Sequence, residues 1–514
     1  MKKEELLEKH PYHAQFSSTW ETYMKMKQSG EDLVDFAIYQ QPRESHLNYV
    51  ARKRDAIVYN FAKTIVDIFS FYLNEKETVR EVPGLENDTQ WKMFVDDADL
   101  QGTNYDVLLN EAQKYASYFG SVGILVNKPY SDGSNLAYEI EKGIYPYYTL
   151  YSLPNIYNWK FVKNPITHRK ELVYLKLYEG NNIWTIWTPI VWQQWELHPK
   201  RGIPVKIVQG ENPLKEIPFV WMLNIRNMEY PELGQSDIID ISRIVLSIAQ
   251  NMSSADEIIK YAGFPIMRVP MKRQDILVPA VEGEEIPVGP TAVVEFDPSQ
   301  GESGKTDWMP TQIKEPVEAI LDVISSKIGE IYRIAYLSGI HGQRKSSQGT
   351  GSGLALRYEF SQLNSVLLAK AINKTEAELV LLYYWLKWRR MDNLFTTVDI
   401  RQSREFSIDE LAVTLDNAIA AYGAVLSKTF RERVQRKIAF SVLPDLSQKD
   451  KKKVIAEIAD NTSEKCEMGT QVTNRALVKS AADAANQPDD QAKLAAGGKP
   501  VDPDQKTDSN PKGK

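Results

Sequence analysis

Cysteine is almost absent from this chain, and its histidines are scattered. The 514 residues include one cysteine, Cys466, which excludes an internal disulfide framework and a cysteine-built zinc cluster. This composition predicts a reducing compartment such as the cytoplasm. No two of the six histidines sit at metal-ligand spacing on a predicted helix, so no metal site is expected. They are His10, His13, His46, His168, His198 and His341.

Long apolar runs and a strong charge of one sign are also missing. No uninterrupted hydrophobic stretch reaches the roughly 20 residues that a membrane-spanning helix needs. The polar start Met1–Glu5 predicts no secretory signal. The formal net charge of −6 argues against a protein that coats nucleic acid by bulk attraction. We therefore expect no membrane partner.

Motifs for catalysis or nucleotide binding are incomplete. The segment Gly301–Thr306 resembles a phosphate-binding loop, but Ser299 stands where the motif needs its first glycine, and Asp307–Pro310 follows where a helix should begin. The glycines of 349–353 lack a preceding strand, and no Gly-x-Ser-x-Gly elbow occurs. Adjacent carboxylates such as Asp96 and Asp97 are typical of a solvated surface. The sequence predicts neither an enzyme nor a cofactor.

The first half of the chain combines helical and strand patterns. Apolar residues at three- and four-residue intervals predict helices over 45–73 and over 103–119, the second ending at Gly120. Residues 123–126, 172–178, 183–187 and 190–195 are rich in β-branched and aromatic residues and predict strands. Four tryptophans of this region pack across strands of one sheet or, alternatively, form a subunit interface. They are Trp184, Trp187, Trp192 and Trp195.

The chain then changes to long helices. Residues 235–262 contain no glycine or proline, and their apolar positions alternate steps of three and four. This narrow stripe predicts packing against one or two helices running alongside, and an ordinary core helix is the alternative. The stripe consists of Ile238, Ile241, Val245, Ile248 and Met252, continued by Ala255 and Ile259.

Two more long helices follow a proline-rich insertion. Residues 263–312 hold seven prolines and two short strand patterns, at 266–269 and 292–296. A second helix is predicted over 313–337, a glycine- and serine-rich loop over 338–353, and a very long helix over 354–391. A strand over 397–400 precedes helices over 408–422, 428–440 and 448–460, and the tail from about 480 has the composition of a disordered segment.

The order of these elements resembles that of the portal proteins of tailed bacteriophages. Four strings support the likeness: Tyr151–Trp159, Ile217–Val220 with Gly234–Asp240, Ser352–Arg357 and Leu443–Asp450. No single string is diagnostic, and the argument rests on their order over roughly residues 100–460. The likeness implies an α+β portal-type fold. Its parts are an N-terminal wing (1–234), first stem helix (235–262), clip (263–312), second stem helix (313–337), tunnel loop (338–353), wing spine helix and strand (354–406), helical crown (407–479) and disordered tail (480–514).

The resemblance also implies a function and partners. Portal proteins form a ring, commonly of twelve subunits, at one capsid vertex of the virion, and are assembled in the host cytoplasm. Double-stranded DNA passes through the ring without sequence recognition during packaging, retention and ejection. The large terminase subunit docks on the clip, the capsid protein or scaffold surrounds the ring, and head-completion or tail proteins bind later at this head–tail connector. ATP is hydrolysed by the packaging motor, so a portal subunit needs no nucleotide motif.

The resemblance assigns roles to particular residues. In the tunnel loop His341, Gln343, Arg344 and Lys345 are expected to face DNA, with Lys327 and Arg333 on the second stem helix. Acidic residues of that helix offset its cations, as suits a channel past which DNA slides. A solvated loop without a ligand is the alternative for 338–353. The clip is expected to present Lys272, Arg273, Glu284 and Glu285 to the motor. The rival class is another head–tail adaptor or minor capsid protein, which would lack paired long helices around a proline-rich insertion.

Overall fold

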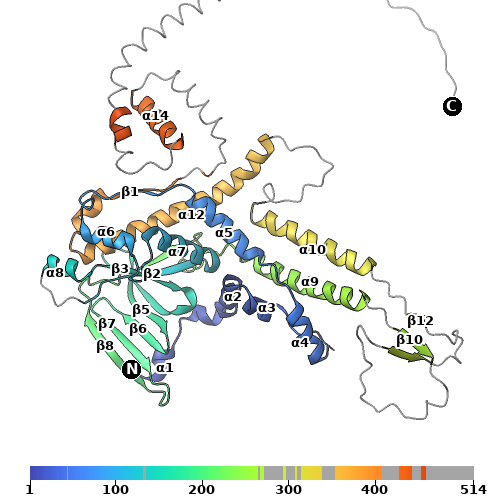
Figure 1. Cartoon of the computed structure of the whole chain (residues 1–514). Coiled ribbons are helices and arrows are strands. Elements are labelled where there is room, and N and C mark those ends of the chain that lie inside the picture. The colour runs from blue at the N-terminus through green and yellow to red at the C-terminus, as the bar shows by residue number, and fades with distance from the viewer. Residues whose placement is uncertain are drawn as a thin grey trace, which may run out of the picture. The chain divides into compact units, whose positions relative to one another are not determined.

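The structure is a computed structural model in which the chain divides into two units, Met1–Ser407 and Ile408–Lys514. It describes residues 1–42, 44–130, 135–263, 267–270, 293–296, 307–308, 314–337, 353–403, 406, 428–442 and 453–458. The first unit mixes helices and sheets, so the expected α+β class is confirmed at this coarse level (Figure 1). Of the second unit, α14 (Lys428–Val442) and a helical turn at 453–458 are described.

Two antiparallel sheets form the body of the first unit. A three-stranded sheet has the order β3-β2-β9, built from β2 (Ser121–Asn127), β3 (Tyr147–Ser152) and β9 (Phe219–Leu223). A five-stranded meander runs β4-β5-β6-β7-β8, as a polar turn follows each strand. Its strands are β4 (Ile156–Lys163), β5 (Lys170–Gly180), β6 (Ile183–Trp187), β7 (Val191–Leu197) and β8 (Pro204–Glu211).

The tryptophans pack across strands of the meander. Trp187 is paired with Trp192 in the register of β6 and β7, and their rings stack with centroids 6.0 Å apart. Trp184 is likewise paired with Trp195. Trp184 and Trp187 are buried within the single chain. Cross-strand packing, the first of the two expectations for this cluster, is therefore confirmed.

Helices precede these strands in the sequence, and one separates β2 from β3. They are α1 (Lys3–Leu7), α2 (Pro11–Gln28), α3 (Glu31–Ala37), α4 (His46–Asp55), α5 (Phe61–Asn74), α6 (Thr89–Asp96), α7 (Tyr105–Phe119) and α8 (Leu136–Glu141). On α2, His13 meets the outer edge of the meander, because its Nε2 lies 2.8 Å from the carbonyl oxygen of Ile156. The helix expected over 103–119 is confirmed as α7, capped by Asn104 and ended by Gly120 at a φ of 93°.

The single helix expected over 45–73 is wrong. The structure has two helices, α4 and α5, separated by an extended segment at 56–60. Asn60 begins α5 by accepting a hydrogen bond from the backbone N–H of Lys63, while its side-chain amide donates to the carbonyl of Met26, 2.6 Å away. The break leaves Leu47, Val50 and Ile57 exposed, three of the apolar residues whose spacing predicted the single helix.

The long helices are present close to their predicted bounds. They are α9 (Ile241–Gly263), α10 (Lys314–Ile334) and α12 (Gly353–Trp388), which at 36 residues is about 54 Å long. Between α9 and α10 the structure describes β10 (Met267–Pro270), β11 (Val293–Phe296) and β12 (Asp307–Trp308) in one sheet. After α12, a 3₁₀ turn (Asp392–Thr397) leads to β13 (Asp399–Arg401), which pairs with β1 (Val79–Glu81).

Candidate functional site: an anchored helical hairpin

Helices α9 and α10 run side by side in opposite directions (Figure 1). Ile324 and Ile331 of α10 belong to the same buried cluster as Val245 and Ile248 of α9. A hydrogen bond of 2.7 Å from Lys327 Nζ to Ser247 Oγ also joins the two helices. We call this pair the hairpin. The insertion 264–313 lies between its two helices in the sequence.

The predicted stem stripe lies largely in the chain's own hydrophobic core. Ile238, Ile241 and Val245 are 0% exposed, Ile248 is 1% exposed, and Met252 packs against the same cluster. Because α9 also contacts α2, α3, α4 and α5, its apolar stripe packs within a single chain. The buried part of the stripe, from Ile238 to Ile248, is therefore covered by the chain itself.

The segment that leads into α9 is fastened to the end of α7. Gly120 and Gly234 both have positive φ and approach so closely that a Cβ at Gly234 would lie 2.3 Å from the carbonyl oxygen of Gly120. Next along the chain, the Ser236 hydroxyl donates to the carbonyl of Tyr118 at 2.6 Å, and the Asp237 N–H to that of Ser117 at 3.0 Å. The residues just before α9 are therefore held against the C-terminal end of α7.

Helix α12 carries three buried charged side chains on one stripe. Lys370, Lys374 and Glu378 are spaced four residues apart and are each at most 2% exposed. Side chains at this spacing lie above one another on a helix. We call these three residues the charged ladder, because each meets a partner from a different part of the first unit.

The first rung of the charged ladder ties α12 to the segment ahead of α9. Lys370 forms an ion pair with Asp237, and both side chains are buried. Its ammonium also donates to Asn224 Oδ1 at 2.7 Å. Burial lowers the pKa of Lys370, and Asp237 opposes that shift. Either partner alone would be an uncompensated buried charge, so separating α12 from the segment ahead of α9 would be costly.

The other two rungs join α12 to the N-terminal half. Lys374 donates to Asn74 Oδ1 at 2.7 Å and to Asn110 Oδ1 at 3.1 Å. Glu378 forms an ion pair with Arg80 and accepts a hydrogen bond of 3.1 Å from the Tyr105 hydroxyl. The charged ladder therefore connects α12 to α5, α7 and the strand β1.

We expect the middle rung to make stability depend on pH. Burial lowers the pKa of Lys374 to about 8, below its usual 10.5. The charged form is disfavoured in the folded state, so the penalty is full below about pH 8 and disappears as the pH rises to 10.5. The free energy of unfolding of the wild type should therefore rise relative to that of Lys374→Met across this interval. Urea titrations at several pH values would measure it, and a constant difference would contradict it.

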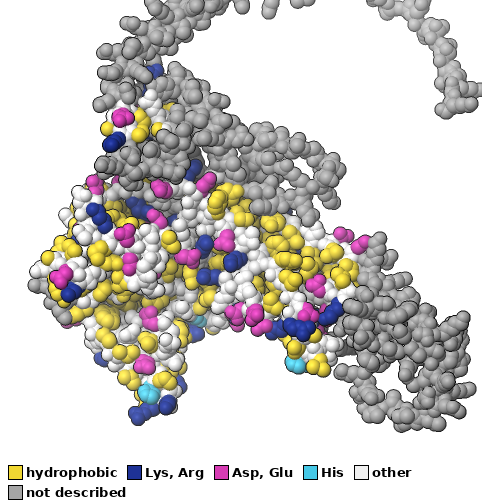
Figure 2. Space-filling view, in the orientation of Figure 1, with side chains coloured by type: hydrophobic (Ala, Val, Ile, Leu, Met, Phe, Trp, Pro, Cys, Tyr) yellow, Lys and Arg dark blue, Asp and Glu magenta, His cyan; other side chains and the backbone are white. Residues whose placement is uncertain are grey.

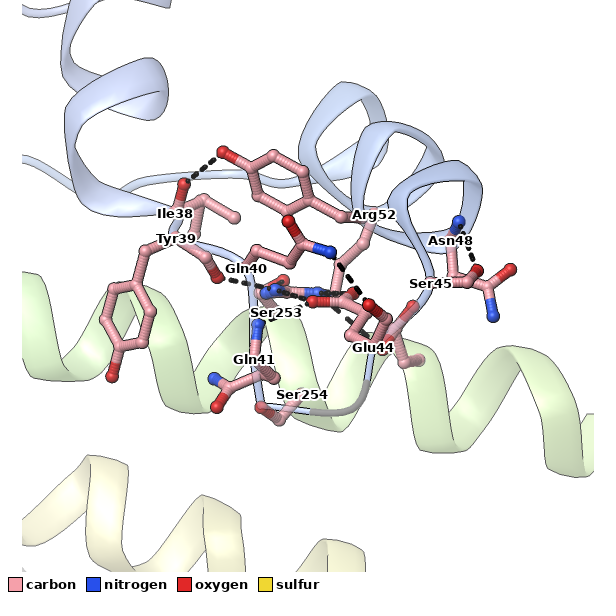
Figure 3. Close-up of polar contacts among 12 residues, drawn as sticks. Ile38, Tyr39, Gln40, Gln41, Glu44, Ser45, Asn48, Arg52, Ser253 and Ser254 are labelled. Atoms are coloured by element: carbon pink, nitrogen blue, oxygen red, sulfur yellow. Dashed lines mark hydrogen bonds and ion pairs between the residues drawn. The ribbon is translucent and has the colours of Figure 1, made fainter.

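A second anchorage holds the middle of α9. Figure 3 shows Arg52 of α4 lying between the 38–45 loop and α9. Its guanidinium donates to both carboxylate oxygens of Glu44, at 2.7 and 2.8 Å, to the Tyr39 carbonyl at 2.8 Å and to Ser253 Oγ on α9 at 3.1 Å. This bidentate bond lowers the pKa of Glu44. Gln250 of α9 adds a 2.6 Å bond to the Ala37 carbonyl.

Removing Arg52 should weaken the contact of α4 and the 38–45 loop with α9. Arg52→Ala leaves the half-buried Glu44 without its cation and the Tyr39 carbonyl without a donor, at a cost of about 2–4 kcal/mol in the free energy of unfolding. Arg54→Ala is the matched control, because this side chain is 75% exposed on the same helix. Denaturant unfolding of both variants would measure the difference. Equal, small losses would show that the buried network contributes nothing.

The other predicted site residues are distributed as follows. Lys327 is half-buried and bonded to Ser247, and Arg333 is exposed and paired with Glu330 on its own helix. The predicted tunnel-loop residues 341, 343, 344 and 345 and the clip residues 272, 273, 284 and 285 lie outside the described residues. The charged ladder and Arg52 are not among the residues that the sequence predicts, and for the ladder the four-residue spacing of Lys370, Lys374 and Glu378 is the one available signal.

Over the part of the chain that the structure describes, no group of histidine, cysteine and carboxylate side chains is arranged to hold a metal. Within the same residues, no helix combines the length and the apolar character needed to cross a bilayer. A scan of protein-family models found no match to the chain, and a search of curated proteins found none either.

Proposed function

We propose that this chain is a portal protein, the subunit of a ring-shaped DNA channel at one vertex of a tailed-phage capsid. The observation that carries the proposal is the hairpin of α9 and α10, interrupted by the insertion 264–313 and rooted in the body by the charged ladder of α12. Helices that transmit or resist force must be held firmly where they leave the body. The buried pair of Lys370 and Asp237 would hold α9 there, because separating the two charges is costly.

The electrostatics of α10 support a channel past which DNA slides. Lys327 is bonded within the chain and Arg333 is paired with Glu330. Few cations are therefore presented to phosphate, so each subunit would add little affinity, and a duplex would move with little resistance. Under this proposal DNA contact comes from the loop 338–353, and the segment 263–312 receives the packaging motor.

Imaging of the purified chain tests the proposal. Negative-stain microscopy of a portal protein shows rings with an axial hole, of twelve or a similar number of subunits. A chain that stays monomeric at high protein concentration, or that forms filaments or solid discs, would overturn the proposal and favour another head–tail adaptor or a minor capsid protein.

The loop gives a prediction of its own. Replacing Arg344 and Lys345 together with alanine should leave rings intact but reduce DNA retention after packaging. The screening length is about 8 Å at physiological salt, so these cations act only close to phosphate. Added salt weakens the wild-type contacts, so the deficit of the double variant should shrink as salt rises. A DNase-protection packaging assay followed by a leakage time course would measure it. Retention equal to wild type in intact rings would assign DNA holding to other residues.

A further inference from the structure

Helix α4 presents an apolar face that none of the described residues covers. Leu47 is 77% exposed, Val50 50% and, just after the helix, Ile57 57%. Leu47, Val50 and Arg54 are spaced three and four residues apart, which places them on one side of the helix. The opposite side holds Arg52 against α9. Exposed aliphatic side chains gathered on one face are typical of an interaction surface.

This apolar face ends in positive charge. Arg54 and Lys260 both pair with Asp55, at 2.9 and 2.8 Å, so the three side chains together carry one net positive charge. Their side chains are 75, 45 and 45% exposed, in the order Arg54, Lys260, Asp55. A partner for α4 should therefore offer an apolar or small surface next to an acidic one.

The outer face of α10 has that character. Leu321 is 45% exposed, and Glu318 and Asp322 beside it are exposed acids. Further along the same side stand Ser325 and Gly329. A Cβ at Gly329 would meet no other atom within 4 Å. A glycine within a helix costs about 1 kcal/mol relative to alanine, and among the described residues no neighbour occupies the space of the missing side chain.

The two faces match in spacing. Leu47 and Arg54 are seven residues apart, as are Asp322 and Gly329, and each pair spans about 10 Å of helix. With the two helices antiparallel, Arg54 meets Asp322, Val50 meets Ser325 and Leu47 lies over Gly329. Large side chains then fill the space above small ones, and opposite charges meet at one end.

The faces also lie on different sides of the hairpin. Helix α10 is bonded to α9 at Ser247, and α4 is bonded to α9 at Ser253, six residues further along. Figure 1 shows α9 between them, and Figure 2 shows hydrophobic side chains over α10 and dark blue Lys and Arg near α4. Two different faces that complement each other make a head-to-tail contact, which closes a ring or extends a filament.

We propose that α4 of one subunit docks on the outer face of α10 of a second copy of this chain. The contact itself joins two copies of this chain and does not depend on the proposed function. Only the closing of such contacts into a ring rests on that proposal. It assigns subunit association to α4 and α10, whereas the apolar stripe of α9 stays within one chain.

Charge reversal and cysteine pairing test the contact. Arg54→Glu and Asp322→Arg should each raise the concentration needed for assembly by about tenfold or more, and the double variant should restore it. Gly329→Leu, which meets open space in the subunit, should block assembly while circular dichroism stays unchanged. In a Cys466→Ser background, Leu47→Cys with Gly329→Cys should form disulfides between copies on oxidation, seen as linked dimers, trimers and larger species on a non-reducing gel. Leu47→Cys with Val323→Cys, about 120° around α10 from Gly329, is the control.

The outcomes separate the two proposals. Wild-type rings that persist in all three assembly variants, or equal cross-linking of both cysteine pairs, would overturn the α4–α10 contact and leave the portal proposal intact. A wild-type chain that stays monomeric would overturn both. A folded Gly329→Leu subunit without assembly, together with rescue by the double charge variant, would establish the contact.

Discussion

Replacing Ile248 with aspartate is expected to disrupt the packing of α9 against α10 and to prevent any assembly that depends on the hairpin. Ile248 is 1% exposed and belongs to the cluster that includes Ile324 and Ile331. An unpaired carboxylate placed there costs several kcal/mol even after it takes up a proton. Since a whole domain is stabilised by about 5–15 kcal/mol, much of that stability would be lost.

The control for this variant lies on the same helix. Ile259→Asp introduces the same charge at a position that is 51% exposed, so its effect should stay within about 0.5 kcal/mol. Urea unfolding of both variants, followed by size-exclusion chromatography, would measure stability and association together. If Ile248→Asp has the same unfolding midpoint and elution volume as Ile259→Asp, the hairpin core assigned here is incorrect.

The long helices were predictable because their pattern is local. Residues 241–262 and 354–388 contain no glycine or proline, so a periodic apolar pattern alone defines their helical state. The start of α9 was predicted six residues early, at 235. Asp237 and the residues around it are held by long-range bonds to α7 and α12 instead of by helical ones.

The break between α4 and α5 was not predictable from periodicity. Residues 56–60 contain no glycine or proline, and Ile57 continues the apolar spacing. The helix ends because Asn60 bonds to Met26, 34 residues away, and because Arg52 binds the 38–45 loop. Both are tertiary contacts, which override local preference. The residues left exposed by this break are those assigned above to a contact with a second copy.

The charged ladder shows why a site of this kind escapes sequence analysis. A lysine, a lysine and a glutamate at four-residue spacing are typical of a solvated helix face, yet here they face the interior. Their partners Asp237, Asn74 and Arg80 lie 133, 300 and 298 residues away along the chain. The sequence offers the spacing but not these partners, so the distinction between an exposed and a buried stripe requires the fold.

Replacing Lys370 with methionine should give the largest loss of stability of any single charge removal on α12. The variant fills the space of the aliphatic stem but leaves Asp237, whose side chain is 2% exposed, without a cation. Breaking a buried pair from one side costs about 3–5 kcal/mol. The double variant Lys370→Met with Asp237→Asn removes both charges and keeps an acceptor for Asn224, so it should recover most of that loss.

Lys387→Met is the matched control, since its pair with Glu216 lies on the same helix with side chains 26 and 38% exposed, and its removal should cost under about 1 kcal/mol. Guanidinium unfolding of the three variant chains beside the wild type would measure the series. A loss in Lys370→Met no larger than in Lys387→Met would contradict the role given to the first rung. So would a double variant as unstable as the single one, because the buried charge of Asp237 would then not be the cause. The expected order follows from solvation alone: a carboxylate that water reaches needs no partner, and one that water does not reach needs its lysine.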